Sequence, residues 1–209
     1  MDERIIQGPE CLREGADWLV TREPRFALVL DQIEEIPLRL RPDGFKALFS
    51  AIISQQVSTA SAAAIWSRIE EAGMMTPERV AAASQDDLAN LGLSRPKIRY
   101  AHALAQAGID YNALRTTPSD DVIAELTSVI GIGEWTAEIY ALFSLGRADI
   151  FPAKDLALQE AAKELFDLPE RPKDRELKVM AEAWSPWRGV AARLLWAYYR
   201  VVKQREGIR

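Results

Sequence analysis

The chain is poor in the residues that build metal centres and disulfides. Its 209 residues include one cysteine, Cys11, and one histidine, His102. A disulfide, a tetrahedral zinc site or a four-cysteine iron–sulfur cluster each needs more such ligands than one copy of the chain supplies. A Ser-His-Asp triad would have to use His102, which lies in a helical run, and the chain has no nucleophile-elbow motif. We therefore expect the chemistry to rest on carboxylates, aromatic rings and backbone groups.

The chain also lacks long apolar runs and an excess of positive charge. There is no stretch of about 18 apolar residues, and the polar N-terminus has no signal-peptide core, so we expect a cytoplasmic protein without a membrane partner. The formal net charge is −5. This charge argues against a strongly electrostatic, non-specific nucleic-acid binder, but it leaves room for a local grip through backbone amides and a few cations.

Strand signals are nearly absent, since only residues 25–30 and 36–40 alternate in the required way. Helical spacing of apolar residues dominates, beginning at Phe45, Leu48, Phe49 and Ile52. The pattern predicts an all-α chain of roughly ten helices in two lobes, with 43–150 as the central lobe and 1–42 plus 151–209 as the terminal lobe. The expected helices include 58–71, one opening at 76–78, a short one opening at 84–87, 94–107, one capped at 117–120, 134–145, 155–165, 174–182 and 185–205, the last beginning after a serine cap.

A short glycine turn, Gly131-Ile132-Gly133, separates two of these helices. Glycines permit positive φ, and successive N–H groups at the start of the following helix form an anion site suited to one phosphate. A plain structural turn between two packed helices explains G-x-G equally well. The longer pattern V-I-G-I-G-E-W-T-A is far more specific.

Four blocks carry a family resemblance in order and spacing: FKALFSAIISQQVSTASAAAI (45–65), LGLSRPKIRYAHALA (91–105), the hairpin through Asp155, and AWSPWRGVAARLLWAYY (183–199). The chain resembles the helix-hairpin-helix DNA glycosylase superfamily, in its 3-methyladenine DNA glycosylase II branch. The resemblance implies a two-lobe fold without a full N-terminal β-lobe. It also implies a monomer that acts on damaged double-stranded DNA, at the nucleoid of a bacterial-type cell.

The resemblance assigns the catalytic carboxylate to Asp155, in F-P-A-K-D-L-A-L. A fixed anion there would stabilise the oxocarbenium-like sugar as the N-glycosidic bond breaks. Asp155 would also serve as a helix N-cap, and both roles can coexist. Lyase-capable relatives have a lysine two residues after Gly133, where this chain has Trp135. We therefore expect a monofunctional hydrolase of alkylated bases that leaves an abasic site, with Lys154 contacting phosphate or lying solvated at the surface.

The other expected roles also follow from the resemblance, apart from the cap at Gln55 and the cationic face, which are expected from the residues themselves. Tryptophan walls would add a cation–π contact to a cationic alkylated purine, and an exposed turn residue would fill the gap left by the flipped base. Arg188 would pair with an acid and brace the site, while Gln55 would cap a helix end. The assignments are Trp135, Trp196, Ile139 and Tyr140 for the base pocket; Gly131, Gly133, Thr136 and Lys154 for the DNA backbone; Gln56 for the gap; carbonyls of Thr127, Val129 and Gly131 for a structural monovalent cation; and Arg95, Lys97, Arg99, Lys154 and Arg193 for a cationic face.

Two alternatives stay open at this stage. One is a glycosylase for another base, such as uracil, hypoxanthine or a mispaired base. The other is a non-catalytic module that binds DNA or a partner through the hairpin, although such a module has no need of Asp155. The sequence does not rank the substrates.

Overall fold

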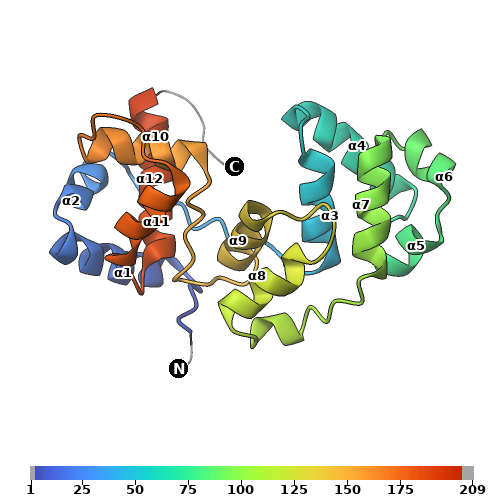
Figure 1. The fold of residues 1–209 in the computed structure, drawn as a ribbon, viewed down its shortest axis with the longest axis horizontal. Helices are drawn as coiled ribbons and strands as arrows, with labels where there is room; N and C mark the ends of the chain where they lie inside the picture. The colour runs from blue at the N-terminus through green and yellow to red at the C-terminus, as the bar shows by residue number, and fades with distance from the viewer. Residues whose placement is uncertain (1–2, 204–209) are drawn as a thin grey trace. The chain divides into compact units, whose positions relative to one another are not determined.

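The computed structural model describes residues 3–203, and this range contains helices, turns and one isolated bridge between Ile5 and Arg147, but no strand. The all-α prediction is confirmed. The helices are α1 (Pro9–Arg22), α2 (Arg25–Leu30), α3 (Phe45–Ser54), α4 (Thr59–Glu71), α5 (Pro77–Ala82), α6 (Gln85–Asn90), α7 (Arg95–Gln106), the 3-10 turn η1 (Ala113–Arg115), α8 (Ser119–Thr127), α9 (Glu134–Phe143), α10 (Leu156–Leu165), α11 (Asp174–Glu182) and α12 (Arg188–Lys203) (Figure 1).

Hydroxyl caps begin several helices where the sequence predicts them. The Ser58 hydroxyl accepts a hydrogen bond from the Ser61 amide at 3.1 Å and begins α4. Thr76 caps α5, whose first helical residue is a proline. Ser84 and Asp87 form a reciprocal capping box at α6. Each cap satisfies an amide that the first helical turn leaves without a partner, which is why these local signals are reliable.

Local details add to the sequence analysis and in one case correct it. Residues 25–30, which alternate weakly in the sequence, form α2, because Phe26 and Val29 lie one helical turn apart and both are buried. Helix α8 begins within the expected segment 117–120, at Ser119, and the Thr117 hydroxyl donates to the Ala113 carbonyl. The last helix begins at Arg188, because the Ser185 hydroxyl donates to the Asp149 carboxylate at 2.7 Å and does not cap.

The chain divides into two compact units. Unit 1 contains residues 1–40 and 141–209, and unit 2 contains residues 41–140. The sequence placed the corresponding boundaries at 42 and 150, so the second one falls earlier in the structure, within α9.

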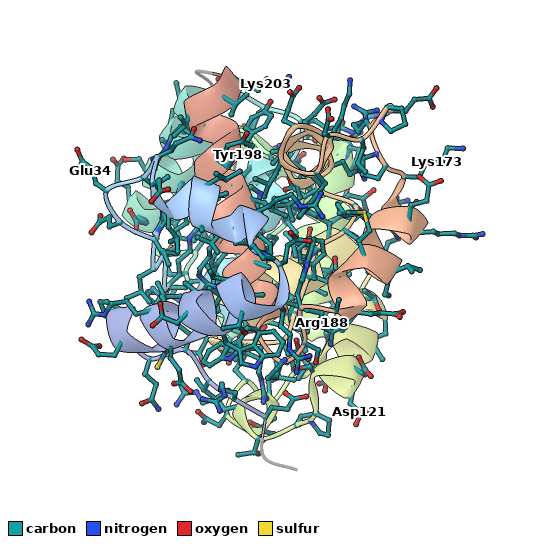
Figure 2. All side chains as sticks on the ribbon, turned by 90° about the vertical axis from the view of Figure 1, so that its left-hand side faces the viewer. Glu34, Asp121, Lys173, Arg188, Tyr198 and Lys203 are labelled. Carbon is teal, nitrogen blue, oxygen red and sulfur yellow. The ribbon has the colours of Figure 1, made fainter. Side chains whose placement is uncertain are left out.

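Unit 1 is built around α12, which is buried continuously from Gly189 to Ala197. It packs against α1, α2 and α10, and Figure 2 shows Arg188 and Lys203 at its two ends. Phe26 of α2 fills the remaining core, with its ring edge-on to the rings of Phe166 and Trp184. Burial of this aromatic cluster explains why the short helix α2 is stable, since six residues form no lasting helix alone.

Unit 2 is organised around α7, which packs against α3, α5 and α6 (Figure 1). The apolar face of α3 is buried as its spacing predicts, and it also packs against α4. In residues 3–203, no helix is long and apolar enough to cross a membrane.

Candidate functional site

The glycine turn of unit 2 joins α8 to α9, and its two glycines differ. Gly131 has φ +96°, in the region that only glycine adopts readily. A methyl group on Gly131 would overlap Cγ of Tyr100 and lie 2.6 Å from its Cβ. Gly133 is outside the positive-φ region, and nothing lies within 4 Å of the place where its Cβ would be. Gly131 therefore uses the positive φ that glycine permits, whereas Gly133 does not.

Gly133 stands at the start of α9, where its carbonyl accepts the first helical hydrogen bond, from Ala137 at 3.0 Å. Backbone amides in the first turn of a helix have no intrahelical partner and carry the positive end of the helix dipole. Thr136 is half-buried in this turn. The open space beside Gly133 lets an anion approach these amides closely, which a side chain would prevent.

A second turn of unit 2 links α3 to α4 and contains the residue expected to fill the base gap. Gln56 is exposed and has φ +55°, a conformation that costs a non-glycine residue about 1–2 kcal/mol. Strain of this kind persists only where the surroundings impose it, and it often marks a functional position. The backbone therefore projects Gln56 from the turn at an energetic cost.

Two contacts that the sequence did not predict hold this turn. The side-chain amide of Gln55 donates to the Gly131 carbonyl at 2.9 Å, and so joins the two turns. The ammonium of Lys97 donates to the Ile53 carbonyl at 2.6 Å, near the end of α3. Gln55 stands at the C-cap position of α3, as expected, and its side chain in addition reaches the hairpin. The place of Lys97 in a cationic face is wrong, because Lys97 is buried and its ammonium donates to a backbone carbonyl.

The aromatic residues expected around the base have different environments. On α9, Trp135 is 37% exposed and Ile139, four residues later, is half-buried. Tyr140 is buried, and its hydroxyl accepts a hydrogen bond from the Gly44 amide at 2.9 Å, where α3 begins. Burial raises the pKa of the Tyr140 hydroxyl to about 12. Tyr140 therefore has a structural role in unit 2, whether or not it also contacts a base.

Trp196 lies on α12 in unit 1 and is 1% exposed, with its ring 5.6 Å from that of Phe143. Arg193, one turn earlier, is also buried and donates to the carbonyls of Gly189 and Leu142. Burial lowers the pKa of its guanidinium. Its place in a cationic face is wrong, because its charge is enclosed by backbone carbonyls. The pocket role of Trp196 stays a prediction.

Asp155 lies in unit 1, at the N-terminus of α10. Its Oδ1 accepts hydrogen bonds from the amides of Ala157 at 2.9 Å and Leu158 at 3.2 Å, so the expected cap is confirmed. The residue is buried, with 9% of its surface exposed. The side chain of Gln159 donates to the Ala153 carbonyl at 2.9 Å and closes the preceding loop onto the helix. Lys154, the residue before Asp155, is exposed.

The loop leading to Asp155 is fixed from the other side by Arg188. Its Nε and Nη2 donate to the two carboxylate oxygens of Asp149 at 2.8 and 2.9 Å. The Gly189 amide also donates to the Ala148 carbonyl at 2.7 Å. The predicted pairing of Arg188 with an acid is therefore confirmed, in the bidentate form that gives an ion pair the most directional strength.

The three carbonyls expected to hold a cation are at the end of α8 and in the hairpin. The Val129 carbonyl already accepts from the Ile132 amide, and that of Gly131 accepts from Gln55. A carbonyl oxygen has two lone pairs, so these bonds leave each atom able to ligate a cation. Thr127 ends α8, where carbonyls lack helical donors. The donor set thus fits a hard monovalent ion. In residues 3–203, no cluster of three or more acidic, His or Cys side chains could hold a metal.

Comparison with known proteins gives consistent matches. The family model described as "HhH-GPD superfamily base excision DNA repair protein" matches residues 49–189. The alkylbase DNA glycosidase-like protein mag2 of Schizosaccharomyces pombe is 28% identical over 73% of this chain and 76% of its own length. The putative DNA-3-methyladenine glycosylase YfjP of Bacillus subtilis is 28% identical over 93% and 71%. The solved structure of a DNA-3-methyladenine glycosidase from Bacillus halodurans superposes with a TM-score of 0.84, at 29% identity, over 99% of this chain and 96% of that one.

Proposed function

Because the chain belongs to the HhH-GPD superfamily of base excision DNA repair proteins, we propose that it is a monofunctional DNA glycosylase for alkylated bases of the 3-methyladenine and 7-methylguanine type. It hydrolyses the N-glycosidic bond in double-stranded DNA and leaves an abasic site. The observation that carries this proposal is Asp155, an acid at a helix N-terminus held by two backbone amides in a braced loop.

Asp155 stabilises the positive charge that develops on the sugar as the base departs. The bonds from Ala157 and Leu158 fix Oδ1, so the carboxylate does not have to reorient during the reaction. The bracing of its loop by Arg188 and Gln159 serves the same purpose. Water completes the hydrolysis, and the carboxylate orients it.

The residue at the position of the lyase lysine supports the monofunctional assignment. A lyase reaction needs a lysine that forms a Schiff base with the sugar. Trp135 occupies the position of that lysine, and its partly exposed ring is suited to stack on a cationic, alkylated purine. Ile139 completes this face of α9.

The hairpin and the base-gap turn bind the DNA. The amides at the start of α9, reached through the open space at Gly133, grip one phosphate, with Thr136 in the same turn. Gln56 enters the gap left by the flipped nucleotide. Unstacking a base costs a few kcal/mol, and a residue that fills the gap offsets part of this cost. Lys154 contacts the backbone beside Asp155.

A monovalent cation such as potassium, bound by the carbonyls of Thr127, Val129 and Gly131, would neutralise the negative end of α8 and stiffen the hairpin. Binding of non-cleaved abasic DNA in potassium chloride and in tetramethylammonium chloride, at one ionic strength, tests this: weaker binding with the organic cation is expected. We further propose that the protein acts as a monomer on chromosomal DNA in the cytoplasm, and light scattering of the free protein tests the first point.

The substrate assignment is tested with purified wild-type protein and duplexes that contain either methylated purines, uracil or hypoxanthine. Released bases are separated by chromatography, and the strands are analysed before and after alkali. We expect release of 3-methyladenine and 7-methylguanine, with strand cleavage only after alkali. Preferential release of uracil or hypoxanthine would show that the protein is a glycosylase for a different damaged base. Binding without release of any base would select the non-catalytic module.

A further inference from the structure

The two DNA-facing turns of unit 2 are joined by one hydrogen bond, from Gln55 Nε2 to the Gly131 carbonyl oxygen. The bond spans two segments that are far apart in sequence, and its length of 2.9 Å is ordinary for this donor and acceptor. A carbonyl oxygen only accepts hydrogen bonds, so the nitrogen of the amide, not its oxygen, must face Gly131. The bond therefore needs a glutamine donor and is not satisfied by a carboxylate.

Helix α7 supports the same pair of turns from behind. Lys97 donates to the Ile53 carbonyl, next to the base-gap turn, while the ring of Tyr100 lies against Gly131. Lys97 and Tyr100 are three residues apart and so lie on one face of α7. Together with the Gln55 bond, these two contacts of α7 connect α3, α7 and the hairpin to one another.

Gln55 is also the residue directly before Gln56, whose backbone is strained. It has extended backbone angles, with φ −62° and ψ 129°, and the chain then enters the left-handed region at Gln56. A side chain anchored at Gly131 restricts the rotation of the peptide between these two residues. The orientation of Gln56 thus depends on the position of the hairpin.

We propose that Gln55 is a positioning residue that couples the phosphate grip of the hairpin to the entry of Gln56 into the base gap. The proposal rests on the proposed function, because it assigns both turns to DNA contact. When a phosphate fixes the hairpin, the Gly131 carbonyl and the Gln55 amide hold Gln56 ready for insertion. Without the Gln55 bond the two contacts form independently, and the affinity for a flipped-out site falls.

A double-mutant cycle measures this coupling. Gln56→Ala removes the gap-filling side chain, and Gly133→Ala places a methyl group where the phosphate approaches. Fluorescence anisotropy gives the dissociation constants of the wild type, both single variants and the double variant for a duplex with a non-cleavable abasic-site analogue. The cycle is repeated in a Gln55→Met background, where a side chain of similar size lacks the donor. Interacting residues deviate from additivity by roughly 2-fold to over 100-fold in the binding constant, and independent ones by no more than about 2-fold.

We expect a coupling of about 5-fold or more with Gln55 present, and less than about 2-fold with methionine in its place. The matched control is Ser54→Ala, the preceding position, whose exposed hydroxyl bonds only within α3 and whose loss leaves the coupling unchanged. Equal coupling in the wild-type and Gln55→Met backgrounds overturns the proposal, as does additivity with Gln55 present. A wild-type protein that does not prefer the abasic duplex to an intact one contradicts the proposed function instead.

A measurement on the wild type avoids any dependence on the folding of the variants. In protein labelled with ¹⁵N at glutamine, we expect the Gln55 side-chain protons to exchange slowly with solvent and to shift when abasic duplex binds. Rapid exchange of the Gln55 protons in the free protein would contradict the role given to the bond with Gly131.

One more variant tests the chemistry of the bond. Gln55→Glu should bind the abasic duplex more weakly than Gln55→Met, because its carboxylate faces a carbonyl oxygen.

Discussion

The two hairpin glycines should respond in opposite ways to the same substitution. In Gly131→Ala the new methyl group lies in the space of the Tyr100 ring, and the residue keeps a φ of +96°. In Gly133→Ala the methyl group meets no atom within 4 Å. The first change should therefore damage the fold, whereas the second should leave the fold intact and impair the binding of DNA.

The expected size of each effect follows from these contacts. A left-handed conformation costs a non-glycine residue about 1–2 kcal/mol, and overpacking of a tight site costs about 1–3 kcal/mol. Gly131→Ala should thus lower the free energy of unfolding by roughly 2–5 kcal/mol, a large part of the stability of an ordinary domain. Gly133→Ala should change it by no more than about 1 kcal/mol. Loss of the phosphate contact should weaken binding of an abasic duplex about tenfold or more.

Urea unfolding, followed by circular dichroism and tryptophan fluorescence, measures the stabilities, and anisotropy measures the binding. Trp66 and Trp135 report on unit 2. Combining Gly131→Ala with Tyr100→Gly, and comparing the pair with Tyr100→Gly alone, separates the two causes. Glycine at 100 removes the Cβ as well as the ring, so it relieves the clash but not the backbone strain. Equal destabilisation by both glycine substitutions would refute the assignment of open space at Gly133. Normal DNA binding by Gly133→Ala would refute the phosphate site.

Three further predictions concern other parts of the two units. Gln56→Gly should raise the free energy of unfolding by about 1 kcal/mol, since it relieves the left-handed strain. Both Gln56→Gly and Gln56→Ala should nevertheless bind an abasic duplex more weakly than the wild type does. Unchanged binding by Gln56→Gly would rule out gap filling by this residue. Stability should fall between pH 10 and 12, because burial raises the pKa of Tyr140 to about 12 and the unfolded chain loses that proton earlier. Tyr140→Phe should flatten this decline in urea titrations without abolishing it, since burial also raises the pKa of Tyr111; an unchanged slope would contradict this assignment. Arg188→Lys and Asp149→Asn should each lower the free energy of unfolding by about 1–2 kcal/mol, because each breaks the bidentate pair. The two effects should not add in a double variant. Full additivity would mean that the interaction between the two side chains contributes nothing to stability.

The helices and their caps were largely predictable because their signals are local. Thr76 followed by proline begins α5, and Ser84 with Asp87 begins α6, since each cap is satisfied within one turn of chain. The positive φ of Gly131 was predictable for the same reason. Residues 25–30 were not, because their helix depends on burial of Phe26 against rings more than a hundred residues away.

The long polar side chains were the least predictable part of the candidate site. Lys97 and Arg193 look like surface cations in the sequence, but both are buried and donate to backbone carbonyls that only the folded chain brings near. The same applies to Gln55, whose partner Gly131 lies in another turn. Asp155 was predictable as a cap from its position before a helix, whereas the brace between Arg188 and Asp149 was predictable only in part, since the sequence did not identify the acid.

The most direct test of the central claim is base release by Asp155→Asn under single-turnover conditions on methylated duplex DNA. Asparagine caps helices about as well as aspartate, so this variant should fold normally and bind the duplex while lacking the negative charge. Asp167→Asn is the matched control, because it neutralises an exposed acid in the same unit. We expect the rate to fall at least about 100-fold for Asp155→Asn and to stay at the wild-type value for Asp167→Asn. Equal rates for wild type and Asp155→Asn would contradict the account.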